Sequence, residues 1–269
     1  MAMHVAMHAE NGSVKVKDRQ LSYVRFGSGA ETLVLIPGVG DGLKTVKGMA
    51  VPMALMYPSL WKRFTVFMFS RSEPLPEHFS TREMAAELSQ AMDRLGIGAA
   101  TVAGASQGGM IAQYLAVDHP EKVKKLILTV TAGRPNDTMR RVLSAWIQMA
   151  RRGDYKGIMT DNAERSYSEK RLRRMRPVYG LLGRVGKPKD FRRFITQAEA
   201  CLAHDAWEEL PRIACPVLVI GGAEDKIVTA RASRELAERI PEAQLVIYSG
   251  LSHALYEEAP DFWKRVREF

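Results

Sequence analysis

The sequence contains only two cysteines, Cys201 and Cys215, among its 269 residues. Their spacing matches neither a metal site nor a disulfide framework, so we interpret them as reduced, buried thiols. No apolar run approaches the roughly 20 residues that a membrane-spanning helix needs. The N-terminal stretch MAMHVAMHAENGSV also lacks the basic start and apolar segment of a secretory signal. These absences predict a cytoplasmic protein that needs no metal.

Acidic residues are fewer than basic ones. The 30 Asp and Glu residues against 39 Lys and Arg give a net charge of +9. Residues 134–208 hold 17 Lys and Arg against 9 Asp and Glu, and so carry most of the excess. Such a segment can attract an anionic partner or can simply be a solvated surface, and both interpretations stay open. Aromatic residues are not interleaved with the charge as a nucleic-acid platform requires. We therefore expect a small-molecule substrate, with an anionic one as an option, and no nucleic-acid partner. The sequence does not indicate an oligomeric state.

Short apolar runs alternate with segments of helical periodicity, a pattern typical of a mostly parallel sheet covered by helices. The first two runs alternate apolar and polar residues, as an antiparallel starting pair does, whereas later runs are continuous, as doubly buried strands are. We expect eight strands, at residues 14–17, 20–26, 32–36, 64–69, 100–103, 125–131, 216–220 and 244–248. The sequence thus predicts an α/β fold with a mostly parallel eight-stranded sheet flanked by helices.

The alternation of strand and helix breaks down in the middle of the chain. A capping box formed by Ser80 and Glu83 predicts a helix that ends at Gly96, and a second helix is expected near residues 107–117. Three further helical segments then follow without a strand between them, at residues 137–151, 161–174 and 190–206. We interpret residues 134–208 as a helical insertion into a core domain made of residues 1–133 and 209–269.

The pentapeptide Gly104-Ala105-Ser106-Gln107-Gly108 has the form Gly-x-Ser-x-Gly. Alone this motif is weak evidence, but an expected strand precedes it and an expected helix follows it. That context is required for a nucleophile elbow, in which a tight turn presents the serine at the carboxyl end of a strand. A phosphate-binding loop is the rival interpretation, but it would contain more glycines and a lysine. We therefore predict that Ser106 is a nucleophile.

A serine hydroxyl needs a base to accept its proton, and the base needs a carboxylate to orient it. His253 follows the last expected strand and would emerge at the same sheet edge as Ser106. The other histidines lie near the N-terminus, at helix boundaries or within the insertion, at His4, His8, His78, His119 and His204. The acid is expected after the preceding strand, where Glu224 and Asp225 both qualify by position.

Over essentially its whole length the chain resembles the α/β-hydrolase-fold superfamily, specifically its serine-nucleophile branch with a helical cap. The resemblance rests on four ordered stretches, Phe79–Ile97, Ser106–Gly109, Leu210–Leu218 and Gly221–Asp225. The last of these resembles the Gly-x-x-Asp signature of the family, which favours Asp225 over Glu224 as the acid. The resemblance implies a catalytic triad of Ser106, Asp225 and His253, with residues 134–208 forming a cap over the site.

The oxyanion hole of this family uses backbone N–H groups, one from the residue after the nucleophile and one from the loop after the third strand. Gln107 supplies the first, and the resemblance implies Val39 for the second. Many relatives have His-Gly where this chain has Pro37-Gly38, a change that should not affect backbone donors. The segment Ser70–Pro74 also departs from the Asp-x-x-Gly-x-Gly that relatives often carry.

These features predict a serine hydrolase that cleaves an ester or a similar small acyl substrate without a metal or organic cofactor. The alternatives are C–C bond hydrolysis, acyl transfer or other chemistry by the same residues on an anionic substrate, and a non-catalytic binding protein. Residues 49–57 are expected to lie in a loop, and their methionines are suited either to an adaptable pocket or to a core. Most aromatic residues of the insertion, such as Trp146 and Phe194, are expected to form the core of the cap.

Overall fold

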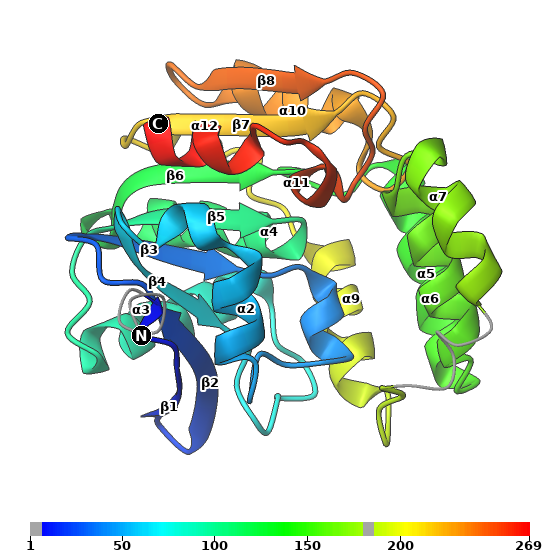
Figure 1. Ribbon diagram of the computed structural model, residues 1–269, viewed down its shortest axis with the longest axis horizontal. Coiled ribbons are helices and arrows are strands. Elements are labelled where there is room, and N and C mark those ends of the chain that lie inside the picture. The colour runs from blue at the N-terminus through cyan, green and yellow to red at the C-terminus, as the bar shows by residue number, and fades with distance from the viewer. Residues whose placement is uncertain (1–6, 180–185) are drawn as a thin grey trace.

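The computed structural model describes residues 7–179 and 186–269, so His4 lies outside the described part (Figure 1). Eight strands form one sheet in the order β1-β2-β4-β3-β5-β6-β7-β8. Their bounds are β1 Glu10–Val16, β2 Arg19–Phe26, β3 Glu31–Ile36, β4 Phe64–Phe69, β5 Ala100–Ala105, β6 Val123–Thr129, β7 Val217–Gly222 and β8 Gln244–Tyr248. β2 pairs antiparallel with β1 and β4, and all the other pairs are parallel. The predicted fold class is confirmed.

Helices cover both faces of the sheet because its inner strands are apolar on both sides. In β3, Leu33 and Leu35 join one buried cluster while Val34 and Ile36 join the other, as the two-residue period of a strand requires. The helices outside the segment between β6 and β7 are α2 Ala50–Met56, α3 Thr81–Arg94, α4 Gln107–Asp118, α10 Thr229–Arg239, α11 Leu255–Glu258 and α12 Phe262–Glu268, with 3₁₀ turns η1 Val39–Gly42, η2 Pro58–Leu60, η3 Pro120–Lys122 and η5 Leu210–Arg212. Helices α2 and α12 pack on the face that carries Leu33 and Leu35, and α3, α4 and α10 pack on the opposite face (Figure 1).

All the described elements between β6 and β7 are helices. They are α5 Asp137–Arg151, α6 Tyr155–Ser166, α7 Glu169–Met175, η4 Arg176–Val178 and α9 Arg192–Ala203. Figure 1 shows these helices beyond the carboxyl ends of the parallel strands. The described residues include no helix of the length and apolarity needed to cross a membrane.

Two details of the expected helices were wrong. The single helix predicted over residues 161–174 is two helices, because α6 ends at Ser166 and Ser168 caps α7 by accepting a hydrogen bond from Arg171 N. The stretch 49–57, interpreted as a loop, contains helix α2. The capping box before α3 is present as predicted, with Ser80 N donating to Glu83 Oε2 at 2.8 Å.

A buried histidine joins the end of the insertion to the core. His204 follows α9, and its Nδ1 lies 2.9 Å from Thr81 Oγ1 on α3. Its Nε2 lies 3.3 Å from Gln113 Oε1 on α4, and its ring meets Tyr114 edge-on at 5.2 Å. Burial disfavours the charged ring and lowers the pKa of His204 to about 3. The histidine is therefore neutral in the folded protein at any ordinary pH.

Replacing His204 with glutamine is expected to reduce the dependence of stability on pH. The unfolded chain binds a proton at this ring below its ordinary pKa of 6.5, whereas the folded chain does not. The free energy of unfolding of the wild type therefore falls as the pH drops below 6.5, by about 2 kcal/mol at pH 5 from this group alone. Urea unfolding of both proteins at pH 7.5 and pH 5 measures the effect. The control is His78→Gln, which removes an exposed histidine, and equal slopes for wild type and His204→Gln would contradict the prediction.

Candidate active site

Ser106 lies in a strained turn between β5 and α4. Its backbone has φ of +54° and ψ of −119°, a conformation that costs a residue with a side chain about 1–3 kcal/mol. The surrounding structure holds this conformation, because Ser106 N donates to Thr129 O at 2.9 Å and Thr131 Oγ1 donates to Ser106 O at 2.7 Å. Although Ser106 is the N-cap residue of α4, its hydroxyl makes no capping hydrogen bond. The strain and the uncommitted hydroxyl fit a nucleophile better than a structural cap.

The two glycines of the motif allow backbone segments to approach each other closely. A methyl group on Gly108 would lie 1.9 Å from Ile36 O, and one on Gly104 would lie 2.2 Å from Gly108 O. The turn therefore packs directly against the loop that follows β3. A methyl group on Gly38 of that loop would lie 3.3 Å from Ser106 Cβ. The loop with the expected oxyanion donor is thus in contact with the serine.

His253 and Asp225 form a buried pair in the loops after β8 and β7. His253 Nδ1 lies 2.9 Å from Asp225 Oδ2, with side-chain exposures of 10% and 1%. Asp225 Oδ1 accepts hydrogen bonds from Ile227 N at 2.8 Å and Val228 N at 3.0 Å. Burial opposes ionisation of the carboxyl, but His253 and the two amides outweigh it and hold the pKa of Asp225 below its usual value. Glu224 is exposed, so the structure brings only one of the two candidate acids to the histidine.

The loop that carries His253 rests on the C-terminal end of α6. Ala254 N donates to Ser166 O at 2.8 Å. Ser252 Oγ lies within hydrogen-bond distance of Glu224 O, at 2.9 Å, and of Arg165 O. The helical insertion therefore supports the histidine loop from one side, while β7 and its following turn support it from the other.

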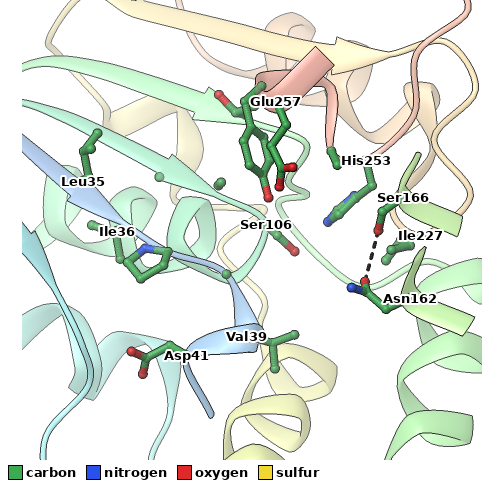
Figure 2. Close-up of a pocket in the computed structure, with 18 of the residues that line it drawn as sticks. Leu35, Ile36, Val39, Asp41, Ser106, Asn162, Ser166, Ile227, His253 and Glu257 are labelled. Carbon is green, nitrogen blue, oxygen red and sulfur yellow. Dashed lines mark hydrogen bonds between the residues drawn. The ribbon is translucent and has the colours of Figure 1, made fainter. Parts of the chain in front are cut away.

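Ser106, His253 and Val39 line one cavity of about 370 Å³, which lies within the usual size range for a small-molecule site. Figure 2 shows the side chains of Ser106 and His253 directed toward the same space. Most of the wall is apolar, including Leu35, Val46, Met49, Met53, Met68, Met110, Met139, Leu143, Trp146, Ile227, Val228, Phe262 and Trp263. Such a wall suits an apolar group of a substrate.

Both expected oxyanion donors begin a helical turn. Val39 is the first residue of η1 and Gln107 the first residue of α4, and the amides of first-turn residues have no acceptor within their own helix. The side chain of Gln107 is buried and points into the protein. Its Nε2 donates to Gln197 O at 2.7 Å, and its Oε1 accepts from Arg71 Nη2 at 2.9 Å.

The methionines and aromatic residues noted in the sequence divide between wall and core. Met49 and Met53, at the start and on the inner side of α2, line the cavity, as does Trp146 of α5. Phe191 and Phe194 are instead buried, in a cluster that also contains side chains of the sheet and of α2.

Several polar residues at or near the cavity were not predicted from the sequence. Asn162 and Ser166 lie on α6 facing it, with Ser166 Oγ donating to Asn162 Oδ1 at 3.0 Å (Figure 2). The buried Asp41 and Arg71 and the partly exposed Arg193 form a cluster behind the loop after β3. The unusual segment Ser70–Pro74 was the one signal in the sequence that pointed to this cluster.

A family model described as the alpha/beta hydrolase fold matches residues 31–260. A provisionally named carbamate hydrolase, RutD, from a Caulobacter species is 26% identical over 87% of this chain and 88% of that protein. The 2-hydroxy-6-oxononadienedioate/2-hydroxy-6-oxononatrienedioate hydrolase of a Pseudomonas species is 23% identical over 96% of this chain and 92% of that one. Among solved structures, the enol-lactonase from Burkholderia xenovorans aligns with a TM-score of 0.81 at 25% identity, covering 96% of this chain and 98% of that chain. The similarity therefore extends over nearly the whole chain.

Proposed function

The chain belongs to the α/β hydrolase fold family and is a hydrolytic enzyme, and from that premise we propose that it is a serine hydrolase that cleaves an ester or a similar small acyl substrate. One observation carries this proposal. Ser106, which has a strained backbone and makes no capping hydrogen bond, shares a cavity with His253. The Nδ1 atom of His253 lies 2.9 Å from the buried Asp225 carboxylate. This arrangement supports Ser106, His253 and Asp225 as the serine, base and acid of acyl transfer.

In the proposed mechanism, Ser106 Oγ attacks the substrate carbonyl while His253 takes its proton. Because Nδ1 of His253 faces Asp225, Nε2 is the ring nitrogen left to accept the proton. Asp225 stabilises the resulting imidazolium, and the N–H groups of Val39 and Gln107 hold the oxyanion. His253 then protonates the leaving group as the C–O bond breaks. A water molecule that loses its proton to His253 finally attacks the acyl carbonyl, the bond from that carbon to Ser106 Oγ breaks, and His253 returns the proton to Oγ.

The walls of the cavity indicate the kind of acyl group that fits. Methionines such as Met49, Met53 and Met139 form an apolar surface that adapts to different shapes. Glu257 also lines the cavity but is paired with Arg171 at 2.8 Å. Lys44 is exposed and has no ion-pair partner within the described residues, which supports a substrate with an anionic end.

We also propose that residues 134–208 act as the cap of a core domain formed by residues 1–133 and 209–269. In support, α5 and α6 contribute residues to the cavity wall, among them Trp146 and Asn162. The same segment supports the His253 loop through Ser166.

Hydrolysis of a C–C bond is the second candidate reaction. It is favoured by the likeness to the Pseudomonas hydrolase, whose name describes a 2-hydroxy-6-oxo dicarboxylate as substrate. The exposed Lys44 at the cavity would suit such an anionic compound. In this case Ser106 and His253 would keep their places, but substrate turnover need not pass through a covalent acyl-Ser106.

The proposal is tested by labelling the protein with a small fluorophosphonate and measuring its intact mass. We expect one adduct on the wild type and none on Ser106→Ala, because only a serine with an effective base reacts readily. A panel of p-nitrophenyl esters, a phenyl carbamate and a vinylogous 1,5-diketone acid then separates the candidate reactions. A folded wild type that neither a fluorophosphonate nor the smaller phenylmethylsulfonyl fluoride labels would contradict the serine hydrolase.

A further inference from the structure

Helix α9 packs directly against η1, the turn that begins with Val39. A methyl group on Gly42 would lie 2.6 Å from Phe194 Cα, so no side chain separates the two backbones. Next to this contact, Arg193 extends from α9 over the loops after β3 and β4. Its Nη1 donates to Ser72 O at 2.6 Å, and its Nη2 donates to Arg71 O at 2.8 Å.

The same guanidinium is paired with Asp41 in η1. Arg193 Nη2 lies 2.7 Å from Asp41 Oδ2, and Arg193 Nε donates to Asp41 O at 3.3 Å. The carboxylate is fully buried, with a side-chain exposure of 0% against 16% for the arginine. One turn further along α9, Gln197 Nε2 donates to the same Oδ2 at 3.2 Å. Figure 2 shows this carboxylate directed away from Ser106, so Asp41 serves the loop rather than the substrate.

A second connection joins α9 to the residue after the nucleophile. Gln107 Nε2 donates to Gln197 O at 2.7 Å, and Gln107 Oε1 accepts from Arg71 Nη2 at 2.9 Å. The same nitrogen of Arg71 donates to Pro37 O in the loop after β3. Both segments that carry the proposed oxyanion amides are therefore tied to the same two turns of α9.

This hydrogen-bond network contributes little to the stability of the fold. Within residues 7–179 and 186–269, seven buried side-chain polar atoms have no hydrogen-bond partner, and five belong here: Asp41 Oδ1, Arg71 Nε, Arg71 Nη1, Ser72 Oγ and Gln197 Oε1. A buried ion pair generally stabilises a fold no better than apolar residues of the same volume, because desolvation offsets the attraction. The directional contacts of this cluster thus call for a role other than stability.

We propose that Arg193 and Gln197 are positioning residues that set the distance between the N–H groups of Val39 and Gln107. This role rests on the proposed function. It means that α9 supports the oxyanion hole as well as forming part of the cap. Oxyanion donors act on charge that develops only in the transition state, so a small displacement of one donor lowers kcat rather than substrate binding.

Arg193→Gln tests the inference, with Arg192→Gln as the matched control. Arg192 is the neighbouring residue of α9, but its side chain is 87% exposed and pairs with Asp190 at the surface. For p-nitrophenyl butyrate we expect Arg193→Gln to lower kcat by about 10- to 100-fold with KM changed less than about twofold. The affinity for a phenylboronic acid, which forms a tetrahedral adduct with the serine, should fall by the same factor as kcat/KM. Arg192→Gln should match the wild type in all three quantities.

Gln197→Met is the second variant, for the case in which Arg193→Gln does not fold. It removes the donor to Asp41 but keeps the backbone oxygen that holds Gln107, so we expect a smaller loss of kcat, about 3- to 10-fold. A folded variant with a lowered Tm and unchanged kcat, or with a raised KM alone, would overturn the positioning role. A wild type whose turnover does not depend on Ser106 would instead refute the proposed function, and the inference with it.

Discussion

Ser106→Ala is expected to lower kcat by a factor of about 10⁴ to 10⁶ while the protein remains folded. Without the hydroxyl, the substrate carbonyl has no nucleophile within the site, and the remaining donors can only assist a poorly placed water molecule. The loss of stability should be small because Ser106 Oγ makes no capping hydrogen bond to α4. Initial rates on the best ester of the panel, with circular dichroism for the fold, measure both effects.

Ser80→Ala is the matched control for this variant, because Ser80 also stands at a helix N-cap. Its hydroxyl accepts a hydrogen bond from Glu83 N, so its removal should lower the free energy of unfolding by about 1 kcal/mol and leave kcat unchanged. The two serines should therefore show opposite effects on stability and turnover. Retention of more than a hundredth of the wild-type kcat in Ser106→Ala would exclude the acyl-enzyme mechanism.

Asp225→Asn is expected to lower kcat by about 10⁴ because it forces His253 into the wrong tautomer. The amides of Ile227 and Val228 require an acceptor, so the asparagine oxygen must take the place of Oδ1. The asparagine NH₂ group then faces His253 Nδ1, where the carboxylate oxygen had accepted a hydrogen bond. Nδ1 must become the acceptor and Nε2 carries the proton, so His253 can no longer take a proton from Ser106.

This substitution separates a catalytic role of Asp225 from a merely structural one. The turn that follows β7 keeps both of its backbone hydrogen bonds in Asp225→Asn, so the thermal midpoint should change little. Glu224→Gln is the control, since it removes the neighbouring carboxylate, which is exposed. Steady-state kinetics at pH 8 measure both variants, and a loss of less than tenfold in Asp225→Asn would mean that this residue only shapes the turn.

Local sequence patterns were sufficient for the order of the strands and for the strained turn at Ser106, but not for helix α2 or for the break between α6 and α7. Continuous apolar runs such as that in β3 are required wherever a strand is buried on both faces. Likewise, Gly104 and Gly108 are needed by the close backbone contacts of the turn, which leave no room for a methyl group. These constraints act over a few neighbouring residues, so they are visible in the sequence itself.

Side-chain direction and contacts between distant segments were decided only by the tertiary structure. Glu224 and Asp225 are adjacent and both acidic, and only the path of the turn directs one of them to His253, 28 residues away. The pairing of Asp41 with Arg193 joins residues 152 positions apart, and neither lies in a pattern that points to the other. By itself, the sequence determined the fold class and predicted the candidate serine and the order of the candidate site residues, because periodicity and turn chemistry are local. The family signature favoured Asp225, but the contact of Asp225 with His253 and the support of the proposed oxyanion loop by α9 depend on packing between elements, which no local pattern records.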